Sequence, residues 1–239
     1  MLAGPDKASV RHYVATGRQP LDAVGRALAL AGLSWAETQT FLDFGAGYGR
    51  VLRWVRSSHP HVEVTAADIN RQAVEFCAAK FGVTPLHVVP DVERLAIPGK
   101  YDVIWVGSVL THLSKQDGVV LLSRLADALS PSGVLTFTTH GTLMNQRIPE
   151  YGTTVAAAQH DIRQALDQVG VYYLPEGRNA HAITFHAPRG VRALLEDVRP
   201  RLTVLEHVAR GWDSHQDVWS CRLAGTAVSA ASPQAVASS

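Results

Sequence analysis

With 239 residues, of which 46% are hydrophobic and 18% charged, the chain is not disordered and fits one α/β domain. Its formal net charge of +1, with acidic and basic residues intermixed, argues against a nucleic-acid partner. Two cysteines, Cys77 and Cys221, are too few for a disulfide framework, and no apolar run suits a signal peptide or membrane span, so we expect a cytoplasmic protein without a membrane partner.

A first helix is expected after Pro20. There, apolar residues recur at helical spacing, at Leu21, Val24, Leu28 and Ala31, and Gly32 can end the helix. Segment 1–34 is therefore predicted to be an N-terminal helical segment that packs on the core.

Short apolar runs then alternate with helical patterns as far as residue 139. The predicted strands cover 40–44, 62–67, 86–89, 101–106 and 134–139, and the predicted helices cover 50–56, 72–81 and 119–129. Strands separated by helices in this rhythm imply right-handed crossovers and a parallel sheet. The five strands predict a doubly wound α/β core.

The alternation fails between His140 and Ala180. Apolar residues at helical spacing nevertheless predict a helix in this insertion, at Val155, Ala158, Ile162, Ala165, Leu166 and Val169. Connections this long commonly form lids or binding walls, so 140–180 is expected to be a helical lid on a domain of residues 35–224. A helix over 188–198 and antiparallel strands over 202–208 and 216–223 follow, and the tail 225–239 is expected to be mobile.

A glycine-rich turn follows the first predicted strand. Asp43 stands at the strand end, and Gly45, Gly47 and Gly49 let backbone N–H groups approach a ligand without a Cβ clash. A dinucleotide-binding turn has its third glycine where this chain has Arg50, and does not usually carry an acid two residues before the first glycine. Both departures favour S-adenosylmethionine over a dinucleotide.

The run D-F-G-A-G-Y-G-R, from Asp43 to Arg50, resembles the first signature of the class I (Rossmann-like) S-adenosylmethionine-dependent methyltransferases. Similarity continues in Y-D-V-I-W-V-G-S-V-L-T-H-L, L-S-P-S-G-V-L-T-F-T-T-H and G-W-D-S-H-Q-D-V-W-S-C-R, and spans roughly residues 8–223. The resemblance implies S-adenosyl-L-methionine as cofactor. It also implies a seven-stranded, mostly parallel sheet of order 3-2-1-4-5-7-6, with the last strand antiparallel and helices on both faces.

Asp68 follows the second predicted strand, nineteen residues after Gly49, where an acid can accept hydrogen bonds from both ribose hydroxyls. The alternative is an N-terminal cap on the helix that follows. The resemblance implies a cofactor site at Asp43, Gly45, Gly47, Gly49, Asp68, Ile69, Asp91, Val92 and Ser108. In that site Asp91 and the Val92 N–H read adenine and Ser108 faces the methionine part, while a solvated turn is the alternative for Asp91.

Transfer of a sulfonium methyl group requires an acceptor atom held in line behind the methyl carbon, without a covalent protein nucleophile. If the acceptor is a hydroxyl or a protonated amine a base helps, and His112 and His140 both follow core strands at the ligand edge. A packed or capping imidazole is the alternative for each. Tyr13 and Arg50 can close over the methionine carboxylate or simply pack. No compact pair of metal ligands occurs, so no metal is predicted.

We expect a small-molecule acceptor, with the acceptor atom (O, N or C) left open, because the modest net charge and an insertion suited to a closed pocket favour one. The alternatives are a methyltransferase acting on protein or nucleic acid and a non-methylating S-adenosylmethionine-binding protein. The apolar stripe of the insertion also allows a homodimer arm.

Overall fold

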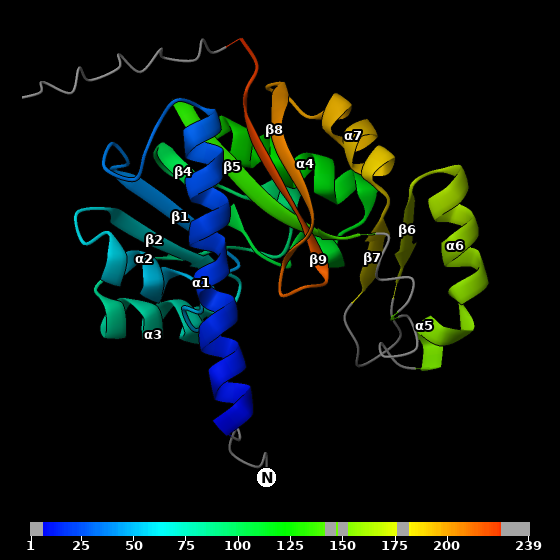
Figure 1. Cartoon of the computed structure of the whole chain (residues 1–239), viewed down its shortest axis with the longest axis horizontal. Coiled ribbons are helices and arrows are strands. Elements are labelled where there is room, and N and C mark those ends of the chain that lie inside the picture. Colours follow the sequence, from blue (N-terminus) through cyan, green and yellow to red (C-terminus); the bar gives the residue numbers. More distant parts are fainter. Residues whose placement is uncertain (1–6, 142–146, 148–152, 176–181, 226–239) are drawn as a thin grey trace, which may run out of the picture.

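A computed structural model of the protein describes residues 7–141, 147, 153–175 and 182–225. Within these residues one sheet of nine strands lies between two layers of helices (Figure 1). The strands are β1 (Thr40–Phe44), β2 (Glu63–Asp68), β3 (Thr84–His87), β4 (Tyr101–Val106), β5 (Leu129–His140), β6 (Val171–Leu174), β7 (Ile183–His186), β8 (Leu202–Trp212) and β9 (Gln216–Leu223).

The sheet has the predicted doubly wound order. Strands β3, β2, β1, β4 and β5 are parallel neighbours in that order, β9 pairs antiparallel with β5, and β8 pairs antiparallel with β9. With β8 and β9 counted as the sixth and seventh strands, the order 3-2-1-4-5-7-6 is confirmed. Strands β6 and β7 add a hairpin, and β7 meets β5 at His140, beyond the point where β4 ends.

Helices cover both faces of the sheet. The helices are α1 (Lys7–Leu30), α2 (Leu52–Ser58), α3 (Arg71–Phe81), α4 (Lys115–Asp127), α5 (Thr153–Ala157), α6 (Gln159–Gln168) and α7 (Pro188–Asp197), with short 3-10 turns η1 (Val92–Arg94) and η2 (Leu110–His112). Helices α1, α2 and α3 share one buried cluster with the sheet, and α4 and α7 share the other. None of the helices in the described part of the chain is both long enough and apolar enough to cross a membrane.

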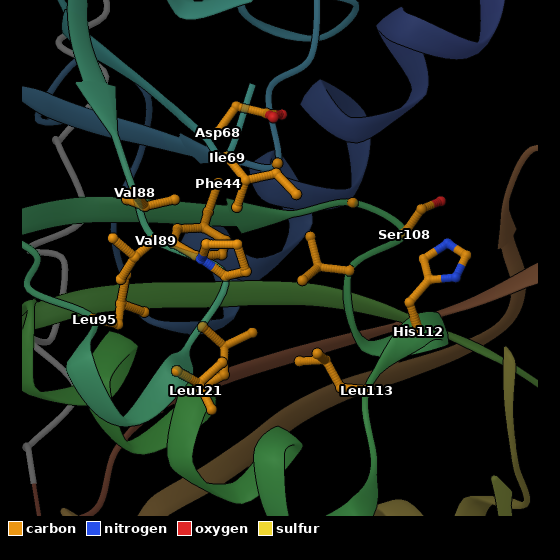
Figure 2. A pocket seen from close by; sticks show the side chains of 15 residues that line it. Phe44, Asp68, Ile69, Val88, Val89, Leu95, Ser108, His112, Leu113 and Leu121 are labelled. Carbon is orange, nitrogen blue, oxygen red and sulfur yellow. The ribbon is translucent and has the colours of Figure 1, made fainter. Parts of the chain in front are cut away.

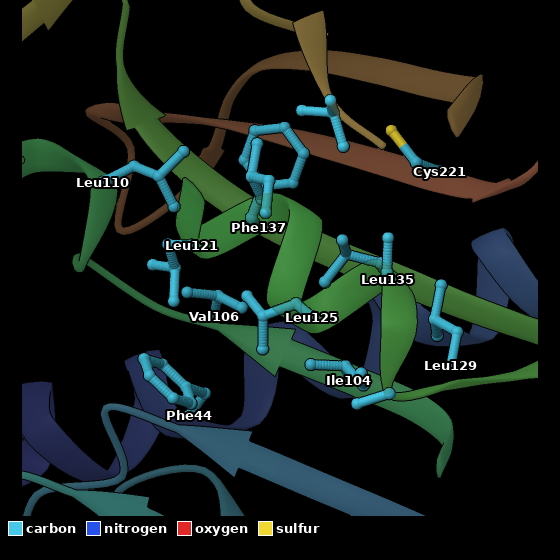
Figure 3. Packing of buried hydrophobic residues seen from close by; sticks show 14 of the residues in the cluster. Phe44, Ile104, Val106, Leu110, Leu121, Leu125, Leu129, Leu135, Phe137 and Cys221 are labelled. Atoms are coloured by element: carbon cyan, nitrogen blue, oxygen red, sulfur yellow. The ribbon is translucent and has the colours of Figure 1, made fainter. Parts of the chain in front are cut away.

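The cluster beneath α4 explains why its sequence forms a helix there. Ser114 accepts a hydrogen bond from the Asp117 N–H at 3.1 Å, which begins the helix. Leu121 and Leu125, four residues apart, are fully buried against β4 and β5, and Figure 3 shows them in this cluster. Truncating either side chain to alanine is expected to destabilise the fold by about 2–5 kcal/mol.

Helix α1 begins earlier than its apolar pattern indicated. The pattern was recognised only after Pro20, within a segment 1–34 predicted to be helical, whereas α1 begins at Lys7 and contains Pro20. A proline inside a helix has no N–H for the carbonyl four residues earlier. Here that carbonyl belongs to Thr16, and it accepts a hydrogen bond from the Trp212 indole N–H at 2.9 Å. The helix continues because a side chain from the far end of the chain supplies the missing donor.

The insertion contains most of the predicted helical stripe and, in addition, strand β6, which pairs with β7 just beyond the insertion; Val169, predicted as part of the stripe, is 65% exposed and follows α6. Val155, Ile162 and Leu166 are buried with Ile183 and Phe185 of β7, so this stripe is covered by the same chain. Figure 1 shows α5 and α6 at the edge of the molecule opposite α3. Residues 142–146, 148–152 and 176–180 of the expected lid, and the tail from residue 226 onward, lie outside the described residues.

Candidate active site

Two cavities open at the carboxyl ends of the parallel strands. The first cavity, of about 470 Å³, has Asp68 and Ile69 on one side and His112 on the other (Figure 2). The second cavity, of about 400 Å³, is bounded by Asp43 and Arg50 among other residues. Gly45, Gly107 and Ser108 line both cavities, so the two spaces meet there. The edge of the sheet that holds them is where ligands bind in open α/β folds.

Asp68, at the end of β2, holds the glycine-rich turn. One carboxylate oxygen accepts the Gly47 N–H at 2.8 Å, and the other accepts the Asn70 N–H at 2.8 Å. The N-terminal cap of α3 is Asn70, whose side chain accepts the Ala73 N–H. Asp68 is therefore not the cap of that helix. Its carboxylate faces the first cavity, with lone pairs left for a ligand.

The three glycines of the turn all have positive φ, but they serve different purposes. A Cβ at Gly45 would lie 2.6 Å from Val109, and one at Gly49 would lie 2.8 Å from Phe81. Gly49 thus permits close packing on α3, and it lines neither cavity. Gly47, with φ of +49°, has nothing within 4 Å of a built Cβ, because it faces the second cavity.

Gly47→Val is expected to fold yet bind cofactor poorly, because its side chain would enter the second cavity. Gly99→Val is the matched control: Gly99 has φ of +85° and equally open surroundings, but lines neither cavity. Each variant is expected to lose about 1–2 kcal/mol of stability from left-handed strain. Calorimetry with S-adenosylhomocysteine should find weakened binding in Gly47→Val only. Equal affinity in both variants would show that the turn around Gly47 does not contact the cofactor.

Asp43 lies behind the turn at the end of β1. It is buried, and its carboxylate accepts the Leu52 N–H at 3.2 Å. Burial is the main cause that raises the pKa of Asp43 to about 7, the Leu52 hydrogen bond opposes it, and the nearby Asp68 charge adds to it. A cation in the second cavity would favour the ionised form.

The side chains of Tyr13, Arg50 and Trp212 form one wall of the second cavity. The Arg50 guanidinium lies over the Tyr13 ring at 4.6 Å and over the Trp212 ring at 5.9 Å, and all three residues line the cavity. Gly17 allows this approach, because a Cβ there would lie 2.2 Å from the Arg50 carbonyl oxygen. Sequence reasoning singled out Tyr13 and Arg50 but missed Trp212, whose only local signal is its place in a polar turn.

The two expected histidine bases differ in position. Nδ1 of His112 lies 2.7 Å from the Ala182 carbonyl oxygen, and Nδ1 of His140 lies 3.2 Å from that of Thr184. A carbonyl oxygen can only accept, so in both rings Nδ1 carries the proton. His112 lines the first cavity and His140 lines neither. Burial lowers the pKa of His140 to about 3, so it stays neutral at physiological pH.

Of the neighbouring residues Asp91 and Val92, only Val92 lines a cavity. Asp91 caps η1, where its carboxylate accepts the Glu93 N–H at 3.0 Å, and it lines neither cavity. Val92 lines the first cavity, as do Ile69 and Ser108. Ile69 is 58% exposed and lines this cavity, so a bound ligand would cover it. In the described part of the chain, no three side chains of the metal-binding types converge.

Residues 42–135 match a family model described as a methyltransferase domain. This range holds the glycine turn, Asp68 and Ser108, and so covers much of both cavities. Residues 42–135 thus form a methyltransferase domain, and the chain has the fold of S-adenosylmethionine-dependent methyltransferases. S-adenosylmethionine consists of a nucleoside and an amino acid joined at one sulfur atom. The two cavities likewise adjoin at one place, lined by Gly45, Gly107 and Ser108.

Several known proteins resemble the chain at low identity. The tetracenomycin polyketide synthesis 8-O-methyl transferase TcmO of Streptomyces glaucescens is 26% identical over 127 residues, which cover 47% of this chain and 34% of that protein. The methyltransferase thus matches about a third of that relative's length. The 1,6-didemethyltoxoflavin-N1-methyltransferase of Burkholderia thailandensis has a TM-score of 0.60 at 17% identity, covering 90% of this chain and 81% of its own. An S-adenosylmethionine-dependent methyltransferase of Clostridium acetobutylicum has a TM-score of 0.57 at 12% identity, covering 90% and 92%.

Proposed function

We propose that the methyltransferase transfers the methyl group of S-adenosylmethionine to a small-molecule acceptor. The observation that carries the proposal is the meeting of two cavities at Gly45, Gly107 and Ser108. With adenosine in the first cavity and methionine in the second, the sulfur that joins them lies at these three residues. The methyl group is then delivered beside Ser108.

The side chains around the cavities complement the charges of this cofactor. Asp68 is placed to accept both ribose hydroxyls, and Ile69 and Val92 offer apolar contacts to adenine. In the second cavity, Asp43 provides a carboxyl group for the cationic part of methionine and Arg50 a guanidinium for its carboxylate. Gly45 and Gly47 let the backbone approach the cofactor closely. Gly49 and Asp91 contribute indirectly, through packing and through the cap of η1.

The acceptor side lies beyond β4, where the insertion meets the sheet. The Thr184 hydroxyl donates to the Leu113 carbonyl oxygen at 2.6 Å, and the Ala182 carbonyl oxygen accepts from His112. These bonds fix β7 beside η2, and because β7 pairs with β6 of the insertion, they support the insertion as the acceptor-side wall. TcmO and the toxoflavin methyltransferase act on small molecules by their names, which supports the same class of acceptor here. The free thiols Cys77 and Cys221 support a cytoplasmic location.

His112 is the stronger of the two proposed bases. Because its Nδ1 donates to Ala182, the neutral ring keeps its basic lone pair on Nε2. That ring lines the first cavity near the place assigned to the sulfur, and Figure 2 shows it on the same side as Ser108. It is thus positioned to take a proton from a hydroxyl or an ammonium group as the new bond forms. The deeply buried His140 is proposed to position β7 through Thr184.

His112→Asn is expected to lower kcat on a hydroxyl acceptor by about 100-fold or more, because general-base catalysis contributes roughly 10²–10⁴. Affinity for S-adenosylhomocysteine should stay within about threefold, since no bond to the cofactor is assigned to His112. Full activity of the folded variant would remove His112 from catalysis. A purely packing role predicts instead that melting temperature and cofactor affinity fall together.

The proposal is tested in two steps. Calorimetry with S-adenosylhomocysteine measures cofactor binding, and labelled methyl transfer from S-adenosylmethionine is then measured against phenolic, N-heterocyclic, peptide and nucleic-acid acceptors. Asp68→Ala serves as the inactive control. Transfer to a small molecule supports the proposal, whereas transfer confined to peptide or nucleic acid identifies the alternative class. Cofactor binding without transfer to any acceptor would favour a non-methylating binding protein.

A further inference from the structure

The N–H, the carbonyl oxygen and the hydroxyl oxygen of Ser108 each have a partner within the protein. Its N–H donates to the Thr138 hydroxyl oxygen at 2.9 Å, and its carbonyl oxygen accepts from the Thr111 hydroxyl at 2.7 Å. Its hydroxyl oxygen accepts from the Gln216 side-chain amide at 2.6 Å. The Ser108 hydroxyl proton and one lone pair on the same oxygen are left for a ligand.

The partners of Ser108 also bind one another. The Thr138 hydroxyl donates to the side-chain amide oxygen (Oε1) of Gln216 at 2.6 Å, so the three residues form a closed ring of hydrogen bonds. Within the ring, the Ser108 N–H donates to Thr138, and Thr138 donates its own proton to the Gln216 side-chain oxygen. The Gln216 NH₂ group is then turned toward Ser108. Thr138 and Gln216 are buried and line neither cavity.

The ring holds Ser108 in an unusual conformation. Its φ is +59°, in the left-handed region that residues other than glycine seldom adopt. Such a conformation persists where the surroundings impose it, and here β5 supplies Thr138 while β9 supplies Gln216. The strained residue lies where the two cavities meet. Antiparallel strand β9 is thereby connected to the loop after β4.

We propose that Thr138 and Gln216 are positioning residues, which hold Ser108 left-handed and aim its hydroxyl group at the atoms around the cofactor sulfur. This inference rests on the proposed function, because the position of the sulfur follows from the cofactor assignment. Gln216 acts by filling one lone pair of the Ser108 oxygen, so that the hydroxyl proton turns away from β9 toward the ligand. Thr138 acts by holding both the Ser108 N–H and the Gln216 amide in place.

A double-mutant cycle separates positioning from general support of the sheet. Ser108→Ala and Gln216→Met are each expected to weaken S-adenosylhomocysteine binding about 3- to 10-fold, the equivalent of one hydrogen bond. If Gln216 acts through the Ser108 hydroxyl, the double variant binds no more weakly than Ser108→Ala alone. Losses that multiply in the double variant would overturn the proposal, as would a Ser108→Ala protein that binds like wild type.

A matched pair of variants tests Thr138. Thr136 and Ser220 form a similar buried hydroxyl pair at 3.2 Å between the same two strands, but line neither cavity. Thr138→Val should weaken binding about 3- to 10-fold, Thr138→Ser should restore it, and Thr136→Val should leave it unchanged. Equal losses in the two valine variants would reduce the ring to a structural role. Should Gln216→Met fail to fold, Gln216→Glu keeps the shape, and its carboxylate would draw the Ser108 proton away from the ligand.

Binding of S-adenosylhomocysteine by the wild-type protein distinguishes failure of the proposed function from failure of this inference. If the folded wild type binds no S-adenosylhomocysteine, the cofactor assignment itself falls, and this inference falls with it. If the wild type binds and the cycle shows multiplying losses, the proposed function stands while the positioning role is overturned.

Discussion

Asp68→Ala is expected to weaken S-adenosylhomocysteine binding about 100-fold or more. Two hydrogen bonds from ribose hydroxyls to a charged carboxylate are each worth about 1.5–3 kcal/mol, and both are lost. The structure adds a second reason, because the same carboxylate holds the Gly47 N–H and so maintains the turn that lines the second cavity. The loss is therefore expected to exceed that of any other single substitution in the site, as measured by calorimetry.

Asp91→Ala is the comparison for this variant. Asp91 is also an acid that follows a parallel strand, but its carboxylate caps η1 and lines neither cavity. Its removal is expected to weaken binding by about tenfold or less, the equivalent of one lost cap. Unchanged affinity in folded Asp68→Ala would exclude the ribose contact. A larger loss in Asp91→Ala would move the main anchoring acid to the adenine side.

Asp43→Asn is expected to stabilise the ligand-free protein at pH 8 and to have little effect near pH 4. The pKa of Asp43 is raised from 3.8 to about 7 in the fold, so the unfolded chain loses this proton first as pH rises. Between these values the folded state binds more protons, and its stability falls by about 1.4 kcal/mol per pH unit, or about 4 kcal/mol in total. Asparagine does not titrate, so the variant should melt on the order of 10 °C higher at pH 8.

The same titration couples cofactor binding to pH. Below pH 7 Asp43 is protonated in the free protein, and a cationic ligand must displace that proton to gain the carboxylate. The affinity of the wild type for S-adenosylmethionine should therefore fall by up to about tenfold per pH unit below pH 7, and level off above it. Asp43→Asn should bind weakly and with a flat pH profile. A wild-type profile that is flat from pH 5 to pH 8 would contradict the coupling.

The sheet was predictable from the sequence because its signals are local. Apolar runs such as 101–106 alternate with helical patterns, and the glycine turn with Asp43 and Asp68 carries its own spacing. These signals predicted the parallel α/β core, and the family resemblance that they carry implied the strand order and the carboxyl-end site. The resemblance also implied Ile69, Val92 and Ser108 as cofactor residues, and the structure brings all three to the first cavity.

The remaining features depend on contacts between distant segments. The helical pattern was recognised only after Pro20, because nothing near this proline in sequence shows that Trp212 satisfies the Thr16 carbonyl. The β6–β7 hairpin was missed because its strands have four residues each and no tight-turn signal between them. Gly49 has the same spacing as the other turn glycines, and only the fold shows that it faces α3.

The hydrogen bond from the Trp212 indole to the Thr16 carbonyl oxygen affects when, during synthesis, the protein can first bind its cofactor. These residues are 196 positions apart, and Trp212 and Tyr13 both line the second cavity. A nascent chain that has emerged only through β5 carries the glycine turn, Asp68 and Ser108, but lacks the indole that completes this wall. Chains normally fold from the N-terminus as they leave the ribosome, so the Thr16 carbonyl of α1 gains the Trp212 indole N–H only late in synthesis. Capture of the cofactor is therefore expected to coincide with the docking of the β8–β9 hairpin, and the methyl donor should bind tightly only to chains whose translation has passed Trp212.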